Sequence, residues 1–126
     1  MATHLRFRLT SGVHGVPLAR VYRVAGFASL TGEPQDYFIG WLKFQGKLAP
    51  VFDLNQVVCE EPTPERFGSR IILVAAEEGR VPYIGLLAPG VTDTAPADDE
   101  TTTPLDLDMY LGMLTTLIPE VPAATR

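Results

Sequence analysis

The stretch YFIGWLKFQGKLAPVFDL, residues 37–54, decides the fold of this chain. Trp41, Lys43 and Gln45 alternate with Leu42 and Phe44. A second β-rich run over 48–54 follows after a tight connection at 46–47. Two short runs joined through a glycine predict a β-hairpin. Because Pro50 has no N–H to donate to a neighbouring strand, we expect it at an edge or a bulge of the second strand.

The segments on either side of this hairpin also have β character. At the N-terminus, Leu5, Phe7 and Leu9 alternate with polar residues, the period of a strand with one buried face. Further β-rich runs lie at 21–24, 70–76 and 83–87. Turn-forming residues predict loops at 11–15, 32–36 and 59–68, and a second hairpin turn at 77–80. No stretch before residue 90 has sustained helical periodicity, so we predict a mainly β domain, a small barrel or sandwich.

The C-terminal part gives a weaker pattern. Residues 92–104 are polar and contain two prolines and three consecutive threonines, which predicts a loop, mobile over 95–105. The apolar spacing of residues 106–118 fits a helix, whereas Gly112 and two threonines favour a strand, so both assignments stay open. Residues 122–126 are expected to be a frayed terminus.

Composition and charge limit the classes of function. The chain has 126 residues, 46% hydrophobic and 20% charged, which predicts one soluble domain. Its apolar runs are too short to span a membrane, it has no signal-peptide pattern, and its single cysteine fits a reducing cytoplasm. Residues 1–80 carry nine basic and eight acidic side chains, and residues 81–126 carry one basic and seven acidic. Without a basic cluster, the chain is not expected to bind nucleic acid or to insert into or dock on an anionic membrane.

Motifs of catalysis are absent from the sequence. It has no Gly-rich phosphate loop, no G-x-S-x-G elbow and no metal-spaced Cys or His pair, so we predict no catalytic, cofactor-binding or metal-binding residue. His4 and His14 lie near expected strand ends and are interpreted as surface or turn residues. Cys59, followed by two glutamates, is interpreted as an inert thiol.

The carboxylates also favour structural interpretations. Asp106 and Asp108, with the acids at 98–100, lack the turn glycine and ligand spacing of a calcium site, which favours a solvated acidic loop. Asp53 lies within an apolar run, so it should accept backbone or hydroxyl hydrogen bonds. We therefore expect Asp53 to have a structural role.

In order and spacing, these segments resemble the CheW-like domain of bacterial chemosensory systems over residues 5–94. HGVPLARVYRV (14–24) is similar to the family's second-strand segment, and RIILVAAEEGRVPYIGLLAPGVTD (70–93) to its later pair of strands. YFIGWLKFQGKLAPVFDL resembles the family's most recognisable motif. The matching positions are Gly40, Gln45, Gly46, Pro50, Val51, Asp53 and Leu54. Among them, Gly46, Pro50, Asp53 and Leu54 are expected to be structural.

The resemblance implies two small SH3-like β-barrel subdomains within one CheW-like domain over 1–126, with no enzymatic activity and no cofactor. It implies a cytoplasmic adaptor that couples the tips of methyl-accepting chemoreceptors into signalling arrays. Further partners that it implies are a CheA-type histidine kinase or other CheW-like proteins. The receptor-binding positions that it implies are Val21, Arg23, Val24, Gly40 and Gln45.

This chain departs from the family pattern in charge and in length. Arg23 stands where the family has a glutamate, and Gln45 stands where it has an arginine. Because charge patterns set partner choice, we expect a different receptor partner. Fewer residues follow Val91 than in the family, and YLGMLTTLIPEV (110–121) is expected to be a compressed remnant of its closing hairpin. A short coupler of the FrzB kind, lacking kinase binding, is therefore the leading hypothesis.

Two alternatives stay open. One is a complete coupler that bridges receptor and kinase. The other is a small β-barrel ligand-binding protein or enzyme.

Overall fold

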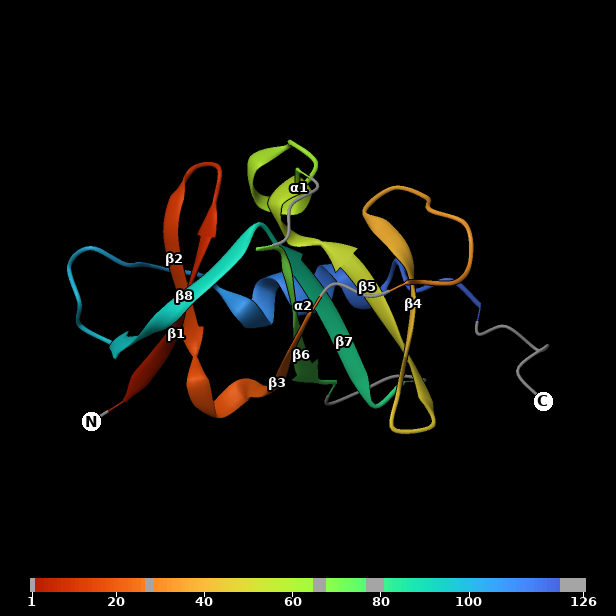
Figure 1. Ribbon diagram of the computed structural model, residues 1–126, viewed down its shortest axis with the longest axis horizontal. Helices are drawn as coiled ribbons and strands as arrows, with labels where there is room; N and C mark the ends of the chain where they lie inside the picture. The colour runs from red at the N-terminus through yellow and green to blue at the C-terminus, as the bar shows by residue number, and fades with distance from the viewer. Residues whose placement is uncertain (1, 27–28, 65–67, 77–80, 121–126) are drawn as a thin grey trace.

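The computed structural model describes residues 2–26, 29–64, 68–76 and 81–120 and has two β-sheets (Figure 1). The first sheet has the order β8-β1-β2-β9, and its strands are β1 (Thr3–Leu9), β2 (Gly12–Pro17), β8 (Gly90–Pro96) and β9 (Thr103–Pro104). The second has the order β3-β6-β7-β5-β4, and its strands are β3 (Val21–Gly26), β4 (Phe38–Phe44), β5 (Lys47–Asp53), β6 (Arg70–Ala75) and β7 (Tyr83–Ala88). The 3₁₀ turn η1 (Leu18–Arg20) connects the two. The predicted mainly β class, with two subdomains, is confirmed.

Strand β1 has the predicted one-sided burial. Leu5, Phe7 and Leu9 have relative exposures of 6%, 0% and 2%. The loop predicted at 11–15 is wrong for most of its length, because β2 begins at Gly12 and pairs antiparallel with β1. The backbone pairing with β1 thus overrides the local turn preference of these residues.

The predicted hairpin is present as β4 and β5, with Phe44 opposite Lys47. Its turn residues are Gln45 and Gly46, one position earlier than predicted, with φ of 50° and 78°. Two consecutive positive φ values are typical of a type I′ turn, which Gly46 accommodates without steric cost. Pro50 lies one residue before the pairing of β5 with β7 begins, so its missing N–H falls outside that ladder, as its expected edge position requires.

A short helix that the sequence pattern does not predict follows this hairpin. Helix α1 (Leu54–Cys59) begins at Leu54, which is 0% exposed, whereas the predicted strand continues through this residue. Asp53 caps the helix, accepting hydrogen bonds from the backbone N–H of Gln56 at 3.3 Å and of Thr63 at 2.7 Å. The hydrogen bonds expected of a buried Asp53 are therefore confirmed.

The open assignment of residues 106–118 is resolved as a helix. Helix α2 (Leu107–Thr115) starts at the capping residue Asp106, which accepts a hydrogen bond from the N–H of Met109 at 3.2 Å. Its buried residues Leu107, Leu111 and Leu114 lie on one helical face. The hairpin remnant expected at 110–121 is wrong, because these apolar side chains pack into the core as a helix.

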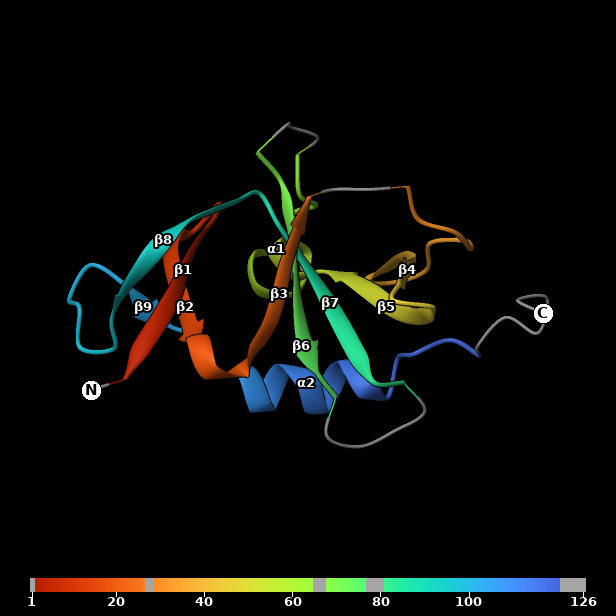
Figure 2. The same ribbon diagram turned by 60° about the horizontal axis from the view of Figure 1, so that its bottom comes forward.

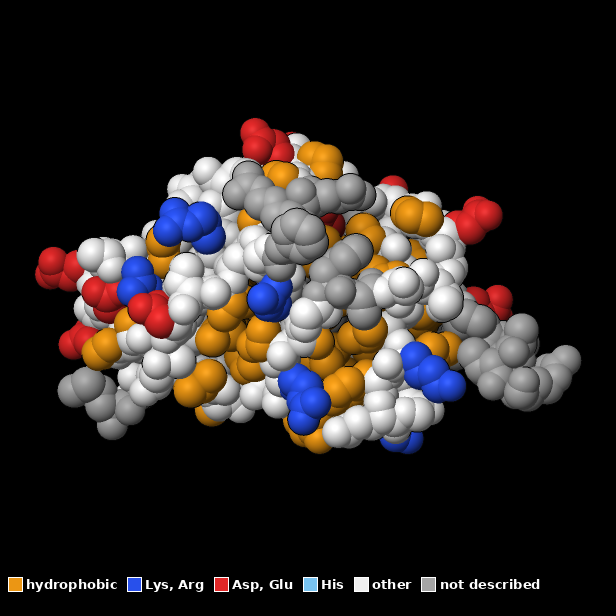
Figure 3. All heavy atoms as spheres, in the orientation of Figure 1, with side chains coloured by type: hydrophobic (Ala, Val, Ile, Leu, Met, Phe, Trp, Pro, Cys, Tyr) orange, Lys and Arg blue, Asp and Glu red, His pale blue; other side chains and the backbone are white. Residues whose placement is uncertain are grey.

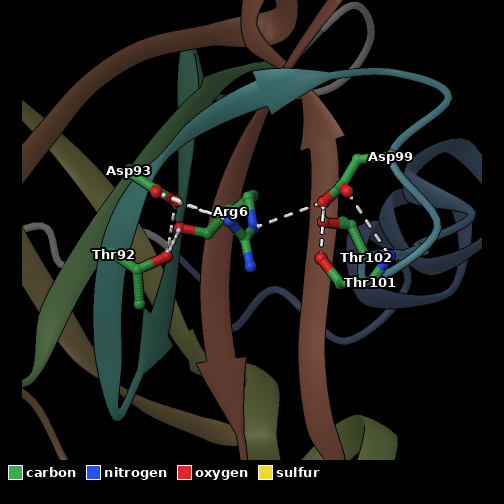
Figure 4. A network of polar contacts seen from close by, with 6 residues as sticks. All are labelled: Arg6, Thr92, Asp93, Asp99, Thr101 and Thr102. Carbon is green, nitrogen blue, oxygen red and sulfur yellow. Dashed lines mark hydrogen bonds and ion pairs between the residues drawn. The ribbon is translucent and has the colours of Figure 1, made fainter.

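The loop predicted over 92–104 is wrong for the residues of β8 and β9, which pair with β1 and β2. The polar side chains of this segment are used in a network over β1 (Figure 4). Arg6 Nη1 lies 3.3 Å from Asp93 Oδ1, and Arg6 Nε lies 3.9 Å from Asp99 Oδ2. The hydroxyls of Thr101 and Thr102 each donate to Asp99 Oδ2 at 2.7 Å. The polar side chains of residues 92–104 therefore form hydrogen bonds and ion pairs over a β-sheet, and their polarity does not indicate a loop.

One hydrophobic core joins the two sheets. It contains Leu5 and Phe7 of the first sheet, Phe52 and Ile72 of the second, and Leu114 of α2. Figure 2 shows α2 running along one side of the second sheet, beside the end of β6 and the start of β7. A smaller cluster lies on the other face of that sheet and consists of Leu42, Ala49, Val51, Ile71, Leu73 and Leu87. No helix in the described ranges is long and apolar enough to cross a bilayer.

Candidate protein-interaction site

Three aromatic side chains from three strands meet on the second sheet: Tyr22 of β3, Phe44 of β4 and Tyr83 of β7. Their ring centroids are 4.7 Å apart for Tyr22 and Tyr83, 5.9 Å for Tyr22 and Phe44, and 5.7 Å for Phe44 and Tyr83. Arg23 Cζ lies 5.5 Å from the Phe44 ring centre, and the Tyr22 hydroxyl is 3.5 Å from Gln45 Oε1. We call these five residues the aromatic seam. Strands β3 and β4 are the two edge strands of this sheet, and no backbone hydrogen-bond ladder joins them in the described part of the chain. The aromatic seam therefore connects them through side chains.

A β-bulge explains how the adjacent residues Tyr22 and Arg23 both approach Phe44. Neighbouring residues of a regular strand point to opposite faces. The pairing of β3 with β6 shifts register between Val21 and Arg23, and such a shift re-aims side chains. Tyr22 is consequently 50% exposed while it still contacts both other rings.

The structure separates the five predicted receptor-binding residues. Arg23 and Gln45 lie in the aromatic seam. Val21 and Val24 pair with Val74 and Ile72, which belong to the core between the sheets. They therefore face the other side of β3 from Arg23, whose partner Leu73 belongs to the smaller cluster.

Gly40 lies apart from the seam and is buried. Its φ is +146°, and a Cβ there would lie 2.6 Å from Leu30 Cβ and 3.0 Å from the Thr31 carbonyl oxygen. Close packing against these two residues accounts for glycine at this position without any partner.

The exposed charge on the strands of the second sheet is positive. Their basic residues are Arg23, Lys43, Lys47 and Arg70, and their single acid, Asp53, is 4% exposed and caps α1. Lys47 lies directly opposite Phe44, which places both on the same face of the hairpin. On the face shown in Figure 3, hydrophobic side chains gather below the centre with Lys and Arg around them, while Asp and Glu lie toward the periphery.

The polar groups of the seam are suited to binding. A side-chain hydrogen bond with Tyr22, together with burial, raises the pKa of Tyr83 above its ordinary value of 10.0. The shift moves the pKa further from neutral pH, where a tyrosine with the ordinary pKa is already protonated. The neutral hydroxyl of Tyr83 can donate and accept hydrogen bonds while its ring supplies apolar contact area.

Sequence reasoning missed the aromatic members of this site. Tyr22, Phe44 and Tyr83 are 22 and more residues apart along the chain, and each fits a strand on its own. Tyr22 lies between the predicted residues Val21 and Arg23. Its position next to them, together with its aromatic side chain, could have identified it as an interface residue. The bulge that exposes it has no sequence signature here.

A second polar cluster joins β2 to α1. The surface position predicted for His14 is wrong, because this side chain is 9% exposed. Its Nε2 lies 2.9 Å from Ser11 Oγ, and the Cys59 thiol donates to the same oxygen at 3.1 Å. Burial lowers the pKa of His14 below 6.5, so the imidazole is neutral at pH 7 and links the two elements without charge.

Comparison with known proteins identifies the fold family. A family model described as the CheW-like domain matches residues 3–111. The chain therefore belongs to the CheW-like domain family, as its sequence motifs predict. A search of curated proteins gives no match.

A solved structure supports the same assignment. The chain is similar to the scaffolding protein TtCheW from Thermoanaerobacter tengcongensis, with a TM-score of 0.67 and 25% sequence identity. The match covers 78% of this chain and 63% of TtCheW, so the chain spans less than two thirds of that protein.

Proposed function

We propose that this protein is a non-catalytic chemosensory adaptor that binds the cytoplasmic tip of a chemoreceptor. The observation that carries the proposal is the CheW-like domain over residues 3–111, found together with an aromatic cluster on the second sheet whose member Tyr22 is exposed. The place of action is a cytoplasmic receptor array, and residues 1–126 act as one CheW-like unit. The core shared by both sheets supports this single unit.

The aromatic seam is the proposed receptor-binding surface. Few residues dominate the affinity of most protein interfaces, and tyrosine and arginine are frequent among them. Tyr22 and Arg23 are adjacent, and both are held by contacts with Phe44. A receptor helix that lies against them meets side chains that are already positioned, so less conformational entropy is lost on binding.

The other predicted receptor-binding positions take different places in this proposal. Gln45 contacts the receptor beside Tyr22. Val24, which is 37% exposed, lies on the face of β3 opposite Arg23 and therefore outside this interface. Val21 and Gly40 act indirectly, by holding β3 and β4 in place.

The test is a binding titration of the purified protein with the cytoplasmic tip fragment of a chemoreceptor from the same genome. Tyr22→Ala should weaken binding about tenfold or more, the usual cost of a truncated interface anchor. Met109→Ala is the matched control, because Met109 is 55% exposed but lies on α2. Equal affinity of both variants, with melting temperatures unchanged, would move the receptor site away from the seam.

A parallel titration with the regulatory domain of the CheA-type kinase decides which form of adaptor this is. Binding to the receptor alone supports the short coupler without kinase binding. Binding to both identifies a complete coupler that bridges receptor and kinase. Binding to neither contradicts the adaptor function and favours a small β-barrel ligand-binding protein or enzyme.

A further inference from the structure

We infer that the receptor segment bound by the aromatic seam is an acidic amphipathic helix, whose carboxylates pair with Arg23 and Lys47. This inference rests on the proposed function and specifies the chemistry of its partner. It starts from two cations that both neighbour Phe44. Arg23 lies over the Phe44 ring, and Lys47 is its direct cross-strand neighbour.

These cations are available to a partner. Both residues are exposed, and neither makes an ion pair within the described part of the chain. The strands around them offer no exposed carboxylate, because the sheet's single strand acid is the buried Asp53. An approaching carboxylate therefore gains two attractive contacts on this sheet and meets no like charge from its strands.

The aromatic rings define the rest of the partner. Tyr22, Phe44 and Tyr83 form a small apolar surface on the same side of the sheet as the two cations. An amphipathic helix has an apolar stripe that fits such a surface and polar residues that flank it. Carboxylates at the border of this stripe reach the guanidinium of Arg23 and the ammonium of Lys47. The same two cations repel a basic helix. The net charge of −5 for the whole chain comes from residues 81–126, which carry one basic and seven acidic side chains.

The experiment combines charge reversal on both partners. We use the same receptor tip fragment, with single Glu or Asp residues on its surface replaced by Lys. Arg23→Glu and Lys47→Glu should each weaken binding on the order of tenfold, since an attraction becomes a repulsion. One Lys-substituted receptor fragment should restore the binding of the Arg23→Glu variant.

Two controls carry the same change in net charge. Arg8→Glu lies on β1 of the first sheet, and Lys43→Glu lies on β4 next to Phe44 in sequence and hence on the opposite face. Both should bind the receptor fragment within about twofold of the wild type. Raising the salt concentration from about 0.1 M to about 1 M shortens the Debye length and should weaken wild-type binding more than that of Arg23→Glu.

The outcomes separate this inference from the proposed function. If the wild type does not bind the receptor fragment, the proposed function fails. If it binds, but charge reversal at Arg23 and Lys47 changes the affinity no more than the controls do, the acidic partner is refuted and the receptor-binding function stands. Loss of binding in the Arg23→Glu variant that no Lys-substituted receptor rescues would also refute the ion pairing.

Discussion

Replacing Gly40 by alanine distinguishes a structural glycine from a receptor contact. The family pattern implies receptor binding at this position, whereas the structure buries it under Leu30 and Thr31. With φ at +146°, an alanine adopts a backbone conformation that L residues rarely occupy, at a cost of about 1–3 kcal/mol. Its Cβ would also lie 2.6 Å from Leu30 Cβ, and relieving such overpacking costs about 1–3 kcal/mol more.

The loss should be easy to measure. For 126 residues, the entropy of unfolding is roughly 0.26 kcal/mol/K, so a loss of about 3 kcal/mol lowers the melting temperature by roughly 12 °C. Thermal unfolding followed by circular dichroism measures this shift, and urea unfolding gives the free energy directly. Gly46→Ala is the control. Its φ of +78° is also strained for alanine, but no atom lies within 4 Å of a Cβ there, so only about 1 kcal/mol, or roughly 4 °C, should be lost.

Receptor binding completes the test. At a temperature where Gly40→Ala remains folded, its affinity for the receptor fragment should equal that of the wild type. A variant with an unchanged melting temperature and no receptor binding would refute the packing argument and return Gly40 to the interface.

Three further predictions concern stability. At Gly112 on α2, no atom lies within 4 Å of an added Cβ, so Gly112→Ala should stabilise the protein by about 0.5–1 kcal/mol. Urea unfolding should show a higher midpoint, and a lower midpoint would show that the added methyl group does not fit. Because burial lowers the pKa of His14, the unfolded chain takes up a proton near pH 6.5 more readily than the folded one, so the free energy of unfolding should be highest above pH 6.5 and fall below it. His14→Gln should flatten this dependence in urea titrations between about pH 7 and pH 5, and an unchanged slope would assign it to another group. Hydrogen bonds from Thr101 and Thr102 lower the pKa of Asp99. The ionised Asp99 therefore contributes to the free energy of unfolding above pH 3.8, and this contribution is lost as the pH falls further. The Asp99→Asn variant should lose less stability over the same pH range.

The sequence predicts those parts of the fold that local patterns determine. Alternation in β1 and the glycine-linked hairpin of β4 and β5 are correct because period-two burial and a positive-φ turn act over a few residues. Strand β8 is missed because its polar side chains are stabilised by Arg6, which is more than 80 residues away in sequence. Helix α1 is missed because six residues are too few to establish a helical period.

The candidate site is predicted only in part for a similar reason. Arg23 and Gln45 are identified through the family motif, but their common neighbour Phe44 connects them only once β3 and β4 are brought together in space. Tyr83 joins them from β7, whose place in the sheet depends on parallel pairing with β5. Non-local pairing of this kind leaves no local pattern in the sequence.

The bulge on β3 also explains how a partner can change while the fold is kept. It sets Val21 and Val24 on one face of β3 and Arg23 on the other, toward the seam, so the three positions are under different constraints although they are nearly adjacent. A change of charge at Arg23 removes no core contact, whereas truncating Val21 removes a partly buried side chain that packs against the core. Partner specificity can therefore evolve along one face of β3 at little cost in stability. In this chain that face carries an arginine beside an aromatic ring, and the proposed acidic partner would be one outcome of such a change.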